Sequence, residues 1–180
     1  RLKEHLEPLW RLWSGQALSQ HQLPYELWAW GRGGALTIAL LSELEALKAQ
    51  SERPTQLLSA PAQRLLWGDH ALTARLSAVG TRHPHSIPLS RAPLPWRLRL
   101  PHQAERFHPL GAPGSKPLKQ LWSAARCAPV ERERLPVLVD GEDRVIWAPY
   151  LRPAEHVRGG AGERWELSFD AQEPLTPLML

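Results

Sequence analysis

Residues 106–122 contain the residue types best suited to binding an anion, because a Gly/Pro turn, a hydroxyl residue and spaced lysines follow one another. The turn over 111–114 would stop an extended segment. Ser115 could then cap a helix whose first N–H groups lack partners and attract anions. Lys116 and Lys119 follow about one turn apart. The pattern indicates a binding site for a phosphate backbone such as that of RNA, and an ordinary capped turn is the alternative.

A helix is expected from Ser115 to Cys127, because apolar residues recur there at helical spacing. The spacing places them on one buried stripe and leaves basic and small polar side chains on the opposite face. Such a helix would present cations from a rigid support. The stripe consists of Leu118, Leu121, Trp122 and Ala125, and the opposite face of Lys116, Lys119, Ser123 and Arg126.

The net charge of +4 is unevenly distributed along the 180 residues. Residues 96–136 contain eight Lys and Arg against three Asp and Glu, a net charge of +5. Residues 1–95 carry +3 and residues 137–180 carry −4. A basic stretch on a mixed surface is typical of a polyanion site, although many charge runs are only solvated faces.

Other chemistries fit the spacing poorly. The glycines at 111 and 114 enclose two residues, whereas a P-loop needs four and a following Lys-Ser/Thr. Cys127 is the only cysteine, so a disulfide within the chain and a cysteine zinc site are excluded. Its place at a helix C-terminus is expected to raise the thiol pKa and leave it inert. His83 and His85 are expected to be loop residues without a metal. Arg132 and Arg134 interleave with two glutamates, which suggests self-paired charges rather than acid/base catalysts.

The elements expected around this segment give an α+β fold: a mostly helical unit with a β-hairpin, followed by a small mixed unit. We predict a helical substrate-recognition domain with the hairpin over residues 1–80, a Pro-rich linker over 81–95, an α+β domain over 96–170 and a loose tail over 171–180. The predicted elements are helices at 2–13 and 36–47, a hairpin at 63–76, and strands at 96–100, 137–139, 144–148 and 164–169.

Three consecutive patterns resemble the C-terminal domain of the tRNA(Ile)-lysidine synthetase family. They are Phe-x-Pro-Leu-Gly at 107–111, Leu-Lys at 118–119 on the helix, and Glu-Arg-x-Arg-x-Pro at 131–136 leading into two strands. The resemblance covers about residues 96–169. The upstream part is similar in composition and order to the middle, substrate-recognition domain of the same family.

The resemblance implies an ATP-dependent ligase that adenylates the wobble cytidine of an isoleucine tRNA and then attaches lysine to it. The family carries this chemistry on an N-terminal PP-loop domain with a Ser-Gly-Gly-x-Asp-Ser signature. Gly31-Arg32-Gly33-Gly34 is the nearest glycine cluster here, and it lacks the Ser and the Asp. The chain is therefore interpreted as the non-catalytic C-terminal half, with no catalytic residues and no cofactor, and with ATP and Mg²⁺ on the catalytic domain.

The expected partners are tRNA, bound through its body and acceptor stem, the PP-loop domain of the same enzyme, and a second copy in a homodimer. A cytoplasmic protein without a membrane span is expected, because no apolar run approaches 20 residues. A protein-interaction or architectural module without RNA binding is the alternative, and an enzyme with an unrecognised site is a third. The predicted RNA-binding residues are Arg106, Gly114, Ser115, Lys116, Lys119, Arg126, Arg132 and Arg134.

Overall fold

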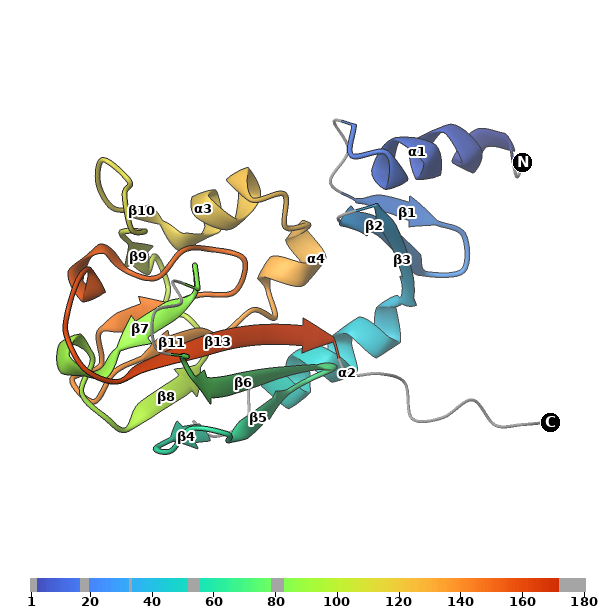
Figure 1. Cartoon of the computed structure of the whole chain (residues 1–180). Helices are drawn as coiled ribbons and strands as arrows, with labels where there is room; N and C mark the ends of the chain where they lie inside the picture. The colour runs from blue at the N-terminus through green and yellow to red at the C-terminus, as the bar shows by residue number, and fades with distance from the viewer. Residues whose placement is uncertain (1–2, 17–19, 33, 52–55, 79–82, 172–180) are drawn as a thin grey trace.

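A computed structural model of the chain describes residues 3–16, 20–32, 34–51, 56–78 and 83–171. Over these residues the fold is α+β, as predicted, and every strand pairing is antiparallel. The N-terminal part lies at one end of the molecule and the larger sheets at the other (Figure 1). None of the helices in the described part of the chain is long and apolar enough to cross a bilayer.

The N-terminal part is a small sheet covered by one helix. Helix α1 lies over β2, where the backbones approach so closely that a Cβ at Gly31 would be 1.9 Å from the Leu12 carbonyl oxygen. Leu12 is the buried residue of that helix, and Pro8 lies inside it, within the predicted range. The elements are α1 (Lys3–Trp13), β1 (His21–Leu23), β2 (Leu27–Arg32), β3 (Ala35–Leu40) and α2 (Leu41–Ser51).

The helix predicted over 36–47 begins only at Leu41, and its first half is strand β3. The apolar residues there also alternate with period two, which fits a strand as well as a helix. Pairing with β2 decides between the two, since Ile38 lies opposite Ala29 in an unbroken ladder. The prediction that the first unit is mostly helical was wrong for this reason.

Two four-stranded sheets enclose the main core. Side chains alternate between the two faces of the sheet, so that Trp96 and Leu98 are buried while Arg97 and Arg99 lie on the opposite face. The sheets meet where the rings of Trp96 and Trp165 pack with centroids 5.0 Å apart. One sheet has the order β12 (Val145–Trp147), β11 (Val137–Val139), β8 (Trp96–Arg99), β4 (Gln56–Leu58), and the other β5 (Arg64–Trp67), β6 (His70–Leu76), β13 (Arg164–Ala171), β7 (Ser86–Pro88).

The predicted hairpin and the predicted strands at 96–100, 137–139, 144–148 and 164–169 are present, with small shifts at their ends. The hairpin, however, lies in one sheet with β13 rather than closing an N-terminal unit. The described part of the predicted 81–95 linker supplies strand β7 to the same sheet and a short helix, η1 (Leu89–Arg91). Long-range pairing with β13 is the reason for both corrections. Of the predicted tail, residues 172–180 lie outside the described residues.

A second layer covers the sheets and carries the segment singled out from the sequence. It contains β9 (Arg106–Phe107), β10 (Lys116–Pro117), α3 (Leu118–Ala124), α4 (Pro129–Arg132) and η2 (Glu155–Val157). The predicted stripe is confirmed, since Leu118 and Trp122 are buried and Leu121 and Ala125 pack against the same core. The Trp122 indole N–H donates to the Pro149 carbonyl over 2.9 Å, as a buried indole requires.

The N-terminal part docks on this layer. Trp30 of β2, Leu44 of α2 and Ala128 before α4 form a small buried cluster of their own. Beside it, Arg32 donates two hydrogen bonds to the Glu131 carboxylate, at 3.1 and 2.7 Å. The α3–α4 corner is therefore both the basic segment of the sequence and the support for the N-terminal part.

Candidate nucleic-acid interface

The strand–helix junction at Lys116 and Pro117 departs from the prediction. Helix α3 begins at Leu118, with Pro117 as its cap residue and no side-chain capping bond. A residue before proline favours extended backbone, and Lys116 pairs with Phe107 in a two-stranded ladder. Ser115 is therefore not a helix cap. Its carbonyl accepts a hydrogen bond from Arg106 Nη2 over 2.8 Å, so its observed role is to fix that guanidinium.

Four cations lie on consecutive elements of this layer, and we call the set the basic face: Arg106, Lys116, Lys119 and Arg132. Arg106 and Lys116 stand on the paired strands β9 and β10, and Lys119 follows on the first turn of α3. Arg132 reaches the same place, because its Nη1 donates to the Lys119 carbonyl over 3.4 Å. Within the described residues, none of the four forms an ion pair with a carboxylate. Their charge is left to solvent or to an anionic partner.

Three of the predicted RNA-binding residues lie away from the basic face or add no charge to it. Arg126 donates to the Gly15 carbonyl over 2.8 Å and so ties α3 to the N-terminal part. Arg134 has a side chain only 11% exposed and lies 3.4 Å from an Asp69 carboxylate oxygen. Gly114 has open space around it. Arg134 thus forms an ion pair with Asp69 that joins the end of α4 to the hairpin.

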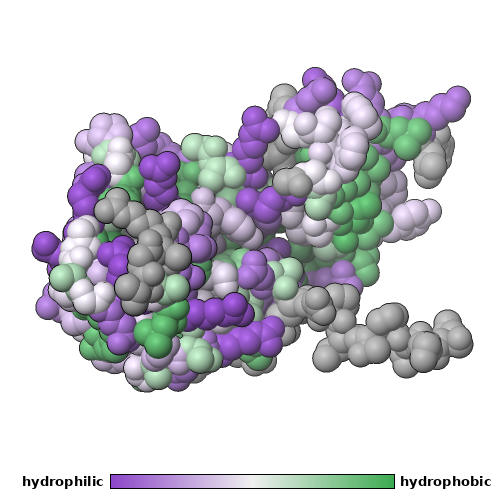
Figure 2. Space-filling view, viewed as in Figure 1, coloured by the Kyte–Doolittle hydropathy of each residue, from purple (hydrophilic) through white to green (hydrophobic). Residues whose placement is uncertain are grey.

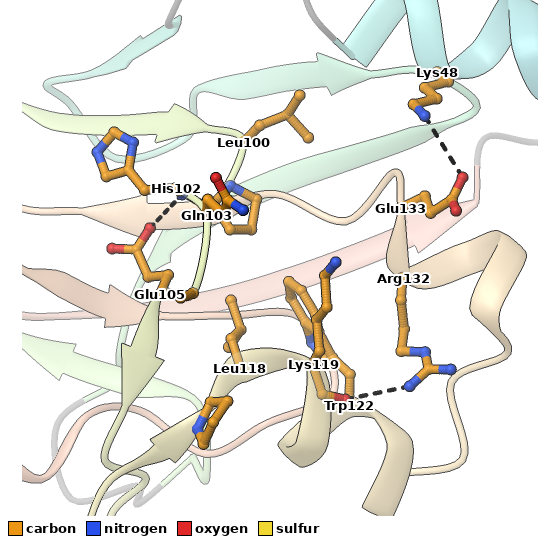
Figure 3. A pocket seen from close by; sticks show the side chains of 13 residues that line it. Lys48, Leu100, His102, Gln103, Glu105, Leu118, Lys119, Trp122, Arg132 and Glu133 are labelled. Atoms are coloured by element: carbon orange, nitrogen blue, oxygen red, sulfur yellow. Dashed lines mark hydrogen bonds and ion pairs between the residues drawn. The ribbon is translucent and has the colours of Figure 1, made fainter.

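A pocket of about 580 Å³ opens beside the basic face (Figure 3). It is bounded by the loop after β8, by the first turns of α3, and by Lys48 from α2. Sequence reasoning found Lys119 and Arg132 here but missed Lys48, whose Nζ lies 3.6 Å from a Glu133 carboxylate oxygen. The residues that line the pocket are Lys48, Leu100, Pro101, His102, Gln103, Ala104, Glu105, Pro117, Leu118, Lys119, Trp122, Arg132 and Glu133.

The loop wall of this pocket is held by a charged network. Glu105 accepts two hydrogen bonds from Arg99, at 2.8 and 3.1 Å, and one from the His102 amide at 2.7 Å. Burial alone would raise the pKa of Glu105, but these bonds outweigh it and hold its pKa below the usual value. The carboxylate is therefore charged and occupied, which leaves the loop with a fixed shape.

Cys127 is buried, and its thiol pKa is raised, as predicted. The largest cause is burial rather than the helix dipole that the sequence suggested. In the part of the chain that the structure describes, no group of three or more His, Cys, Asp or Glu side chains is placed to hold a metal ion.

A model of the TilS substrate C-terminal domain matches residues 96–169. These residues form a TilS C-terminal domain. The TilS domain runs from the start of β8 to residue 169, two residues before the end of β13. It therefore contains the whole basic face and every pocket residue except Lys48.

Two similar proteins agree with this assignment. A tRNA(Ile)-lysidine synthase from Geobacillus kaustophilus (strain HTA426) is 34% identical over 59 residues, which span 33% of this chain and 13% of that protein. A crystal structure of a TilS C-terminal domain superposes with a TM-score of 0.56 at 22% identity, covering 67% of this chain and all of the other. That share is larger than residues 96–169, so the shared fold extends beyond the TilS domain boundaries.

Proposed function

We propose that this chain is the tRNA-recognition half of a tRNA(Ile)-lysidine synthetase and that its basic face holds the RNA backbone. The observation that carries the proposal is the set of Arg106, Lys116, Lys119 and Arg132 on neighbouring elements of the TilS domain, without carboxylate partners in the described residues. Cations placed in this way gain most from phosphates, because binding releases the condensed counterions of the RNA. The contacts would fix register and orientation without reading bases.

In this proposal the chain clamps the body and acceptor stem of the tRNA, and a PP-loop domain supplies the ATP and Mg²⁺ chemistry. The helix shape of the RNA would provide selection and its phosphates affinity. A homodimer and a cytoplasmic location accompany the proposal as expectations. A protein-interaction module remains the second candidate, because large apolar side chains such as Leu6, Trp10 and Ile38 are exposed on the N-terminal part.

The test is a salt series of tRNA binding by the triple variant Lys116→Gln, Lys119→Gln, Arg132→Gln. Each phosphate contact contributes about 0.9 to the slope of log K against log salt, so we expect the slope to fall by about 2–3. The matched control changes three exposed arginines on other elements, Arg64, Arg75 and Arg91, to Gln. It removes the same charge and should change the slope much less. Equal slopes for the two triple variants would contradict a localised RNA site and favour the interaction module.

A further inference from the structure

The pocket beside the basic face has an apolar interior. Leu118 and Trp122 close its floor and are 2% and 1% exposed, so they are already packed. Leu100, Pro101 and Pro117 line it while keeping part of their surface accessible. A hollow of this size, apolar inside with a few polar groups around it, is typical of a site for a small organic group.

The rim of the same pocket is cationic. Lys119 points across the opening and has no ion-pair partner in the described chain (Figure 3). Among the described residues, the Arg132 guanidinium donates only to the Lys119 carbonyl, over a long 3.4 Å. Lys48 adds a third positive group from α2, 3.6 Å from the Glu133 carboxylate. An anion at this rim would meet at least two cations that have no better partner.

Two exposed side chains belong to the loop that lines the pocket (Figure 3). Gln103 carries an amide that can donate and accept, and His102 a ring that can do the same. The loop itself is held in place by the hydrogen bonds of Glu105 to Arg99 and to the His102 amide. The pocket therefore combines an apolar interior, hydrogen-bonding groups and a pair of cations.

We infer that this pocket takes one unpaired nucleotide of the bound RNA, with its base against Pro101, Pro117 and Leu100 and its phosphate at Lys119 and Arg132. This deepens the proposed function and rests on it. A paired base has its faces covered by neighbouring bases, so only an unstacked nucleotide can bring a base into the pocket. Because Lys48 comes from α2, the pocket is complete only when the N-terminal part is docked.

The experiment compares two RNA duplexes of the same sequence, one blunt and one with a two-nucleotide single-stranded extension, on the full chain. Burial of part of the apolar surface of the base against these side chains should tighten binding of the extended duplex about five-fold. Lys119→Gln should abolish the gain. The matched control Lys116→Gln removes the same charge outside the pocket, so it should weaken both duplexes equally and keep the gain.

A second pair of variants tests the hydrogen-bonding group without changing charge. Gln103→Ala should reduce the gain from the extension and leave blunt-duplex binding unchanged. Gln120→Ala alters an exposed amide of α3 outside the pocket and should change neither. An equal reduction for both variants would contradict the placement of the nucleotide.

Titration with cytidine 5′-monophosphate and with ribose 5-phosphate, followed by amide chemical shifts, separates a base site from a phosphate site. We expect the nucleotide to shift the signals of Gln103, Ala104 and Lys119 more than the sugar phosphate does. Equal shifts, or no gain from the extension while Lys116→Gln still lowers the salt slope, would overturn the pocket and leave the proposed function standing. Nucleotide shifts without any duplex binding would overturn the proposed function and keep the pocket. If a peptide shifts the amide signals of the pocket residues and a nucleotide does not, the pocket is a site for a protein partner.

Discussion

The N-terminal part, α1 to α2, and the two-sheet core differ in how they bury apolar side chains. The core encloses Trp96, Trp122 and Trp165 almost completely. The N-terminal part has few buried side chains, and Figure 2 shows apolar surface gathered on its sheet below α1. Most of the exposed large apolar side chains that the structure describes belong to it: Leu6, Trp10, Trp13, Tyr25, Ile38, Leu40 and Leu41.

The two regions therefore depend on different interactions. The core is stabilised by its own apolar burial, which is the dominant favourable contribution to folding. The N-terminal part buries little by itself and is placed by its contacts with the α3–α4 corner, the Trp30 cluster and the Arg32–Glu131 pair. Breaking the core should therefore affect the whole chain, whereas breaking the N-terminal contacts should act locally.

The largest effect is expected for Trp122→Ala in the core. Removing a buried indole and leaving its cavity should lower the free energy of unfolding by about 3–5 kcal/mol. The matched control is Trp10→Ala, whose side chain is 57% exposed and should cost no more than about 0.5 kcal/mol. Chemical denaturation monitored by circular dichroism measures both. Similar losses of unfolding free energy for the two variants would contradict the proposed difference between the two regions.

Gly31→Ala should act next most strongly, but only on the N-terminal part. Its Cβ would lie 1.9 Å from the Leu12 carbonyl oxygen, so α1 must move away from β2. Overpacking of this kind costs about 1–3 kcal/mol. Hydrogen exchange should show lost protection in α1 and normal protection in β8 and β11. Gly114→Ala, placed in open space, is the control and should leave exchange unchanged throughout.

A smaller effect is expected for Arg32→Met, which tests the docking contact. The variant keeps the apolar stem of the side chain but removes both bonds to Glu131, whose own side chain is 11% exposed. Among the described residues the carboxylate would then keep only the hydrogen bond from the Ala128 amide, and this loss should cost about 2 kcal/mol. The measurement is the protection of the β2 and β3 amides. The double variant with Glu131→Gln should recover part of the loss, and no recovery would show that the pair is not what places the sheet.

The sequence was sufficient to predict an element where the pattern that defines it lies within that element. The stripe of α3 and the alternation of β8 and β13 appear in the structure because each buries one face against a single core. The turn between β11 and β12 was predictable too, since Asp140 accepts bonds from the Glu142 and Arg144 amides and closes it locally. Local patterns identify elements of this kind.

The sequence was insufficient where the structure of a segment depends on partners far away along the chain. Leu36 and Leu40 fit both a helix and a strand, and only the ladder to β2 resolves the choice. Among the candidate site residues, Arg134 pairs with Asp69, which lies 65 residues earlier in the chain and is marked by no local pattern. Lys48 was missed because α2 meets the pocket only in three dimensions.

The position of β13 in its sheet has a consequence for the order in which the chain is synthesised. It lies between β6 and β7, and Trp165 pairs with Leu76 on one side and with Ile87 on the other. The hairpin β5–β6 therefore emerges from the ribosome long before its partner strand, with an unpaired edge that could join another chain. Closure of the sheet waits for β13, so the core can complete its folding only after β13 has been synthesised, and a holding chaperone would be most useful in that interval.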